Sequence, residues 1–360
     1  MSPRIALVLV VLLAVLGGGA LLYQQQERSR RPDNAGVLGQ VLLKGLKAAD
    51  IATLRIVEPK ATQSGQTLTL QRGETGWAIA ERAGFPADIA KVREFALQLL
   101  NLKVGQSEPI GEQDRARLNL DDSGTLVEFR GAGGKPLGSL IVGKKYFKRE
   151  VDNPEKAIGD GRFVLLPAEP KTVYIVGDPL LQATARTAEW IERASFQAEK
   201  VKTLEVKFPG GGGYRIERKA DNADWKLAGL KPGEKLDVSR ANAASYSLSL
   251  LDLADVLPKD TKDTGLDKPI GITAATLDGL AYNIKVGKLQ GDNYFVTFTS
   301  TGTVKPDPKD KDAERIKKLT ERQPREKLLS GYVLLIPKGR LEDTLKKRPE
   351  LLEKKQDRKK

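Results

Sequence analysis

The sequence of this chain contains one pattern twice, and this duplication restricts the fold more than any other feature. The hexapeptide Leu-Gln-Leu-Leu-Asn-Leu at 97–102 recurs as Leu-Ser-Leu-Leu-Asp-Leu at 248–253. Three shorter runs precede each copy in the same order: 54–56 with 204–206, 68–72 with 214–218, and 77–79 with 225–227. Solenoid repeats have periods of about 20–50 residues, and this period is far longer. The sequence therefore predicts two tandem domains of one fold.

The three short runs in each half are predicted to be the strands of a β-meander. Apolar and polar residues alternate along them, as in a sheet with one buried and one wet face. The connections at 73–76 and 219–224 are rich in residues that favour turns. Further strands are predicted at 125–130, 137–142, 281–286 and 294–298. Val-Gly-Lys occurs at 142–144 and at 286–288, and we interpret both copies as turns at strand ends.

The Leu-rich segment of each half has the periodicity of an amphipathic helix. In the first half the predicted buried stripe is Val92, Phe95, Ala96, Leu99 and Leu100. Alignment of the hexapeptides predicts the stripe Ala243, Tyr246, Ser247, Leu250 and Leu251 in the second half. Asp88 precedes the first helix, and Asp237 or Ser239 the second, as N-cap residues.

These elements predict an α+β fold of two tandem modules, each an antiparallel β-meander packed with a Leu-rich helix. The expected domain bounds are 44–193 and 198–348, and each domain is expected to fold largely by itself. Residues 179–196 join them, with a predicted helix that ends at Trp190-Ile191. The late strands 173–176 and 332–336 can each pair with either sheet, and the sequence leaves this open.

Five residues are predicted to anchor the two cores. Trp77 and Trp225 begin alternating strands at equivalent places in the two halves, which favours a buried position over a ligand-stacking one. The complete predicted core set is Trp77, Phe95, Leu99, Trp225 and Leu250.

The composition excludes many reaction classes. The chain has no histidine and no cysteine, so a His-based triad, a thiol nucleophile and a thiolate or imidazole metal site are all absent. The pair Asp121-Asp122 precedes Ser-Gly and a strand, which is typical of a turn. The glycines at 210–213 lie between two predicted strands, without the sequence of a phosphate-binding loop. Carboxylate-pair chemistry or a Ser–Lys arrangement remains open, but both residue types are common on surfaces and the sequence selects no pair. We therefore predict no catalytic, cofactor-binding or metal-binding residues and a protein that is not an enzyme.

The N-terminal residues 1–31 are predicted to form a membrane anchor with a basic flank. No charged residue occurs from 5 to 23, a length that nearly spans a bilayer core as a helix. The anchor residues include Ile5, Leu12, Leu16, Leu22 and Tyr23. A cleaved signal peptide with its cleavage site at 18–20 is the alternative. Arginines at 28, 30 and 31 favour a cytoplasmic chain, but long domains cross with little regard to charge. We expect a single-pass inner-membrane protein with its bulk outside the cytoplasm.

Charge suggests a class of partner. The chain carries a formal net charge of +13, which attracts anionic lipid headgroups, envelope polymers or an acidic protein surface. Basic residues are scattered among acidic ones and aromatic residues are few, so we predict no nucleic-acid partner. The charged insert at about 304–326 is expected to be a solvated loop or short helix, and 349–360 a basic tail.

An apolar N-terminus followed by repeated strands, a "Gly-Trp-x-Ile" strand, a capped Leu-rich helix and a "Val-Gly-Lys" strand resembles the bacterial domain of unknown function 4340 family. The resemblance covers nearly everything after residue 44 and brings no catalytic signature. It implies a membrane-anchored envelope protein, with an ABC-type transporter or a related membrane complex as partner. We therefore expect a non-enzymatic accessory or scaffold subunit. A binding module for an anionic envelope polymer or lipid headgroup is the alternative.

Overall fold

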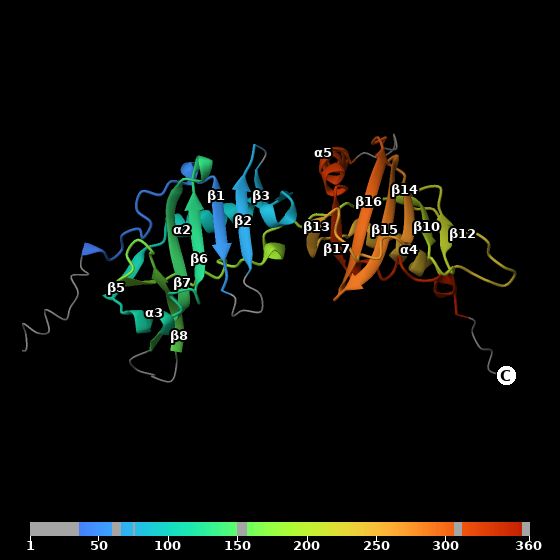
Figure 1. Ribbon diagram of the computed structural model, residues 1–360. Helices are drawn as coiled ribbons and strands as arrows, with labels where there is room; N and C mark the ends of the chain where they lie inside the picture. Colours follow the sequence, from blue (N-terminus) through green and yellow to red (C-terminus); the bar gives the residue numbers. More distant parts are fainter. Residues whose placement is uncertain (1–35, 60–65, 75, 150–156, 306–311, 355–360) are drawn as a thin grey trace, which may run out of the picture. The chain divides into compact units, whose positions relative to one another are not determined.

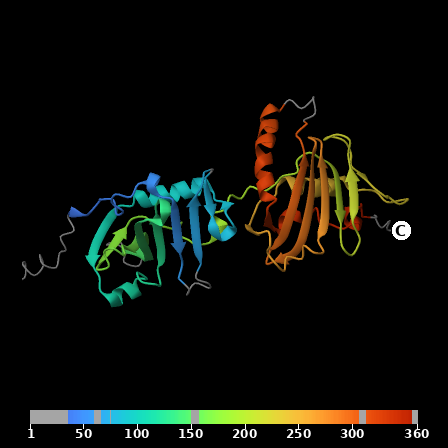
Figure 2. The ribbon, with the colours of Figure 1, turned by 45° about the horizontal axis from the view of Figure 1, so that its top comes forward.

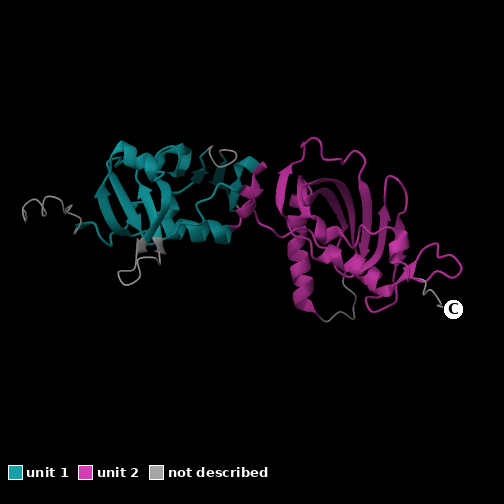
Figure 3. Ribbon diagram, turned by 90° about the horizontal axis from the view of Figure 1, so that it is seen from below, with its two compact units in different colours: residues 1–81, 89–186 teal, residues 82–88, 187–360 magenta. Residues whose placement is uncertain are grey.

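The computed structural model describes residues 36–59, 66–74, 76–149, 157–305 and 312–354 (Figure 1). The chain divides into two compact units (Figure 3). Unit 1 comprises Met1–Glu81 and Ile89–Arg186, and unit 2 comprises Arg82–Asp88 and Thr187–Lys360. No helix in the described ranges is long and apolar enough to cross a bilayer. The predicted anchor at 5–23 lies outside those ranges.

The first sheet has the strand order β4-β3-β2-β1-β6-β7-β8-β9-β5 (Figure 1). Its strands are β1 (Thr53–Val57), β2 (Thr67–Arg72), β3 (Trp77–Ile79), β4 (Phe85–Pro86), β5 (Val104–Pro109), β6 (Thr125–Arg130), β7 (Pro136–Arg149), β8 (Ala157–Leu165) and β9 (Thr172–Val176). Strand β1 alternates between buried and partly exposed residues, with Leu54 and Ile56 facing the core. This is the period-two pattern that the sequence predicts.

The second sheet has the strand order β12-β11-β10-β14-β15-β16-β17-β13. Its strands are β10 (Val201–Lys207), β11 (Tyr214–Glu217), β12 (Lys226–Leu227), β13 (Asp255–Pro258), β14 (Ile270–Thr276), β15 (Leu280–Gln290), β16 (Asn293–Gly302) and β17 (Tyr332–Pro337). From β3 to β5 and from β12 to β13, the two sheets place corresponding strands in the same order.

The late strands stay within their own sheets. Strand β9 pairs with β8 and β5, and β17 pairs with β16 and β13, all antiparallel. The partner choice that the sequence leaves open is therefore decided within each sheet. In both sheets the strand that follows the Leu-rich segment, β5 or β13, reaches the edge beside this late strand.

Helix α2 (Ile89–Leu100) lies behind the strands of the first sheet, and α4 (Val238–Tyr246) has the equivalent position in the second chain half (Figure 1). Val92, Phe95 and Leu99 are buried, as their stripe predicts. Asp237 is the N-cap of α4 and accepts a hydrogen bond from the backbone N–H of Arg240. The remaining helices of the described ranges are α3 (Glu112–Arg117), α5 (Ala313–Leu329), α6 (Lys338–Leu341) and short 3-10 turns, among them η5 (Thr187–Glu189) and η6 (Ser247–Ser249).

The predicted buried stripe of the second helix is wrong by two positions, although its last member, Leu251, is buried after the helix has ended. The buried residues of α4 are Ala241, Ala244 and Ser245, and Leu248 follows them in η6. The Asp237 cap fixes where α4 begins, and the helix ends before the leucines are reached. The hexapeptide therefore does not indicate which residues of α4 face the core, because it lies after the end of that helix.

The predicted helix between the halves is also wrong. Helical structure within 179–196 is limited to the three residues of η5. Trp190, in the turn after η5, and Ile191 are buried, and the backbone that follows η5 hydrogen-bonds to residues 86–88 of the same unit: the Trp190 carbonyl accepts from the Asp88 N–H at 2.8 Å. Backbone groups used in this way cannot also pair along a helix.

The residues just before each predicted domain bound pack in a similar way. Val41 forms an isolated bridge with Lys103, and Ala194 forms one with Asp252. Phe196 is fully buried, and its ring stacks on Phe298 at 4.0 Å. The bounds 44–193 and 198–348, and independent folding, stay predictions. A fragment that tests unit 2 has to begin before Phe196.

The Val-Gly-Lys motif lies inside strands β7 and β15. The interpretation of both copies as turns at strand ends is therefore wrong. Pairing shifts register directly after Val142 and after Val286, which is the geometry of a β-bulge. An added Cβ at Gly287 would stand 2.1 Å from the Thr264 carbonyl oxygen. Glycine is therefore needed because another backbone segment crosses the bulge at close range.

Replacing Gly287 with alanine is expected to lower the free energy of unfolding by about 1–3 kcal/mol, because the methyl group overlaps the Thr264 carbonyl. Urea unfolding of the full chain measures this. Gly271→Ala on the neighbouring strand β14 is the matched control, since a Cβ there meets nothing within 4 Å. Its stability should stay within about 0.5 kcal/mol of the original. Equal effects of both substitutions would refute the close approach.

Candidate docking surfaces and a buried charge network

Each unit contains an arginine stacked on a tryptophan, at corresponding strands. The Arg72 guanidinium lies 5.2 Å from the ring centre of Trp77, and that of Arg218 lies 4.7 Å from Trp225. Arg72 also donates hydrogen bonds to the Ala48 and Ala49 carbonyls, and Arg218 donates one to Val201. Arg72 thus joins β2 and Trp77 to the residues just before β1. Arg218 joins the end of β11 and Trp225 to β10.

The five predicted core residues lie in different environments. Phe95 and Leu99 are fully buried, Trp225 is 5% exposed, and Trp77 is partly buried. Leu250 is 44% exposed, so its prediction as a core residue is wrong. The reason is the phase of α4: the buried leucines of the second copy are Leu248, Leu251 and Leu253.

Both Leu-rich helices expose apolar side chains at the same two positions. Counted from its first residue, each helix has an exposed apolar residue at its first and ninth positions. These are Ile89 and Leu97 in α2, and Val238 and Tyr246 in α4, all 44–63% exposed. Single exposed apolar residues are normal, but the same pair on two corresponding helices is a candidate surface for a protein partner. Sequence periodicity predicts only the buried face of α2.

Helix α5 is the part of the charged insert that the structure describes, and it packs beside β16 and β17 (Figure 2). Leu319 and Leu329 are buried, and Glu326 is 1% exposed. The expected solvated loop or short helix is therefore wrong for this part. Ile316, Leu319 and Leu329 share a helical stripe with Arg322 and Glu326, so the mixed-charge reading missed an available signal.

Glu326 is the centre of a buried charge network. The Tyr282 hydroxyl donates to its carboxylate at 3.0 Å, and the Arg322 Nε lies 3.0 Å from the same group. Arg322 also forms an ion pair with Glu199 at 2.9 Å. Near the start of α5, Arg315 holds the buried Asp278 with two hydrogen bonds of 2.8 and 2.9 Å. The network therefore fixes α5 against the second sheet through Tyr282 and against the segment just before β10 through Glu199.

The hydrogen bonds and ion pairs of this network hold α5 in place, and burial shifts the pKa of two of its members. Burial raises the pKa of Glu326, and the neighbouring Arg322 opposes that shift. Burial also raises the pKa of the Tyr282 hydroxyl, so it remains a hydrogen-bond donor at neutral pH. Buried charges paired with arginines in this way are typical of a scaffold as well as of active sites. No cluster of three or more possible metal-ligating side chains occurs in the described ranges.

Two other sequence features have structural roles. Asp121 accepts a hydrogen bond from the Ser123 N–H, and its hydrogen bonds with Ser123 lower the pKa of its carboxyl. This is the predicted turn before β6. The glycines at 210–213 join β10 to β11, as the predicted hairpin loop. Neither feature brings functional side chains together.

Two antiparallel sheets of matching strand order, with few helices, define the class: a mixed α and β protein dominated by antiparallel sheet. A family model described as "Domain of unknown function (DUF4340)" matches residues 77–269, more than half of the 360 residues. The chain belongs to this family. The match includes both stacked tryptophans and both Leu-rich helices. No curated protein and no solved structure matches the chain.

Proposed function

We propose that this chain is a non-enzymatic, membrane-anchored envelope protein that serves as an accessory or scaffold subunit of an ABC-type transporter or a related membrane complex. Residues 5–23 are its single-pass anchor in the inner membrane. Two tandem α+β modules follow the anchor on the extracytoplasmic side. Their role is to hold or position partner subunits.

The matched apolar pairs on α2 and α4 carry this proposal. Ile89 with Leu97, and Val238 with Tyr246, give each module an apolar surface on a helix that its own sheet already supports. Such residues are favourable contact points for a protein partner, since their burial removes apolar area from water. Two similar surfaces on one chain suit a subunit that bridges or grips a larger complex.

The side-chain chemistry supports a non-enzymatic role. The sequence has no histidine or cysteine. The buried carboxylates Asp278 and Glu326 are both held by arginines of α5, so each is engaged in fixing that helix. A carboxylate that acts as a general base needs a position from which it can reach a substrate proton.

The proposal is tested by crosslinking and mass spectrometry on native membranes that contain the tagged full chain. We expect a membrane-complex subunit to be recovered, and to be lost from the Leu97→Glu/Tyr246→Glu variant. Leu289→Glu, on β15, is the matched control because it also charges an exposed leucine. Equal recovery with both variants would overturn the docking role. The same preparation tests the anchor: a mature N-terminus at Leu21, or protection from added protease in spheroplasts, would contradict it.

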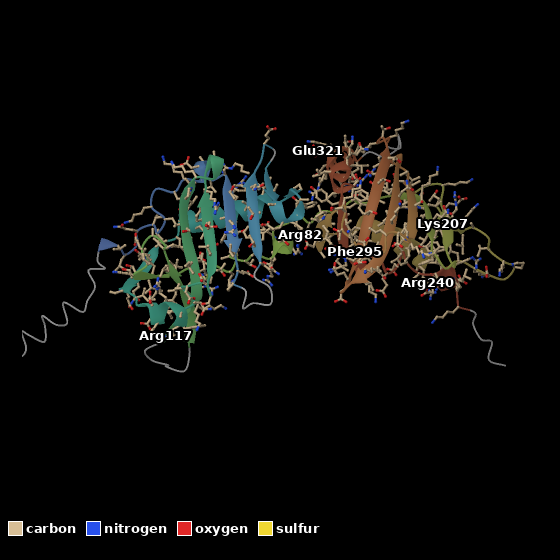
Figure 4. The ribbon with its side chains drawn as sticks, in the orientation of Figure 1. Arg82, Arg117, Lys207, Arg240, Phe295 and Glu321 are labelled. Atoms are coloured by element: carbon tan, nitrogen blue, oxygen red, sulfur yellow. The ribbon has the colours of Figure 1, made fainter. Side chains whose placement is uncertain are left out.

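A second candidate is binding to an anionic envelope polymer or lipid headgroup, and the net charge of +13 favours it. Figure 4 shows basic side chains in both units, with Arg117 labelled in unit 1 and Lys207 and Arg240 in unit 2. Binding of this kind is weakened by salt because it depends on screened charges. Salt-sensitive binding to anionic vesicles, without a crosslinked subunit, would favour this candidate.

A further inference from the structure

A small pocket lies beside α2 in unit 1, between that helix and the Arg72–Trp77 stack. Its volume is about 200 Å³. Its lining is Ala48, Ile51, Leu54, Arg72, Trp77, Ile89, Val92, Arg93, Ala96, Leu97 and Phe129. The exposed pair Ile89 and Leu97 thus contributes directly to the pocket. The pocket belongs to the candidate docking surface and gives it a depth that a flat patch lacks.

Its size selects among ligands. Sites for drug-sized ligands and cofactors enclose about 300–1,000 Å³. This pocket is smaller, and most of its lining is aliphatic or aromatic. One large apolar side chain fills such a space, whereas a full lipid acyl chain does not. Trp77 provides an aromatic wall that gives a packed side chain well-defined contacts.

The charged residues that line the pocket restrict the kind of ligand further. Among the described residues, both charged residues that line the pocket are arginines, and no carboxylate lines it. Arg72 is held by Trp77 and the Ala48 and Ala49 carbonyls. The Arg93 side chain makes no hydrogen bond or ion pair within the described part of the chain, so its guanidinium is available to an incoming anion. A carboxylate next to the inserted side chain would find that partner.

We propose that this pocket receives one apolar side chain from an acidic segment of the partner protein, with Arg93 pairing with a neighbouring carboxylate. The inference rests on the proposed function for the partner being a protein, and it names the chemistry of the contact. Leu97 and Ile89 flank the inserted side chain, and Ala96 leaves the room for it.

The corresponding place in unit 2 has different chemistry, which assigns this contact to unit 1 alone. The cavity beside α4 is lined by Asn242 and Ser245 from the helix, and its charged lining is mixed: Glu199 and Asp221 stand beside Lys200 and Arg218. Asn242 stands where α2 has Arg93, counted from the first helix residue, and it accepts from the Trp225 indole. Carboxylates in the lining would repel an acidic segment.

The test uses the full chain labelled with 5-fluorotryptophan, and fluorine NMR of its three indoles, assigned by Trp→Phe variants. The probe is the peptide acetyl-Glu-Leu-Glu-amide. We expect the Trp77 signal to shift in a saturable way while those of Trp190 and Trp225 stay in place. Acetyl-Gln-Leu-Gln-amide and acetyl-Glu-Ala-Glu-amide should each bind roughly tenfold more weakly, having lost the charge or the anchor.

Two variants complete the test. Arg93→Glu should weaken the probe by roughly tenfold or more, and Ala96→Phe, which fills the pocket, should do the same. Lys207→Glu, an exposed charge reversal on β10 of unit 2, should leave binding unchanged. Unmoved Trp190 and Trp225 signals verify that each variant is folded. No saturable shift of Trp77, or equal binding of the alanine peptide, overturns the inference. Neither result affects subunit recovery by crosslinking, so failure of the pocket and failure of the proposed function are distinguishable.

Discussion

Replacing Arg322 with methionine is expected to lower the free energy of unfolding of unit 2 by about 3–5 kcal/mol, because it leaves a buried carboxylate without its cation. Glu326 is 1% exposed and depends on Arg322, Tyr282 and the Gln197 N–H for its partners. Arg322 also donates to the Gln197 carbonyl at 2.9 Å, so α5 would lose its hold on the segment that enters β10. Urea unfolding measures the loss.

The pH dependence of this loss identifies its cause. Burial already raises the pKa of Glu326 above 4.5, and removal of Arg322 takes away the charge that opposes this shift. A carboxyl whose folded-state pKa is raised stabilises the fold below its unfolded pKa, and this contribution is lost as the pH rises through the folded pKa. The deficit of Arg322→Met should therefore be smaller near pH 5 than near pH 8.

Two further variants serve as controls. Adding Glu326→Gln to Arg322→Met should recover part of the loss and remove its pH dependence, since no buried charge remains. Lys318→Met breaks an exposed pair with Glu314 on the same helix and should cost less than about 1 kcal/mol. A deficit in Arg322→Met that does not change with pH would mean that lost packing, and not the unpaired Glu326, is responsible.

Trp225→Ala is expected to destabilise unit 2 by about 3–5 kcal/mol, the usual range for removing a buried aromatic ring. The indole N–H donates to the Asn242 Oδ1 at 2.8 Å, which ties β12 to α4. The Arg218 guanidinium stacks on the ring and would lose that contact. Trp77→Ala should cost less, because Trp77 is only partly buried and does not fill an equally closed site.

Denaturant unfolding, followed by circular dichroism, measures both tryptophan variants. Tyr246→Ala is the matched control: this aromatic residue ends α4 but is 63% exposed. It should change stability by no more than about 0.5 kcal/mol. If Trp225→Ala and Tyr246→Ala were equally mild, the indole would not be part of the unit 2 core.

Most strands could be predicted from the sequence. The predicted run 125–130 coincides with β6, and the predicted late strands coincide with β9 and β17 apart from one residue at one end of each. Alternation identifies such strands because a two-residue period has only two possible phases, and burial of one face selects between them. The candidate docking residues were not predicted, since periodicity identifies the buried face of a helix and says nothing specific about an exposed apolar pair.

Helix α5 shows a second limit. Its net composition is that of a solvated segment, and its single-residue properties indicate exposure for Arg322 and Glu326. Their partners include Tyr282 on β15 and Glu199 just before β10, which are distant from α5 in the sequence and lie beside it in the fold. The helical stripe of α5 marks its buried face, but the partners of a buried charge are a property of the assembled sheet and cannot be found by local patterns.

By itself, the sequence determined the duplication, most strands of both sheets and the phase of α2. The tertiary structure alone decided the fate of the two similar hexapeptides. Residues 97–100 end α2, with Leu97 exposed, whereas Leu248 is buried in η6 after a shorter helix. Both copies then bury the last leucine, Leu102 or Leu253, just before β5 or β13. Burial of these residues depends on where the N-cap starts the helix and where the edge strand begins. Similar residues between those two points adopt the conformation that connects them.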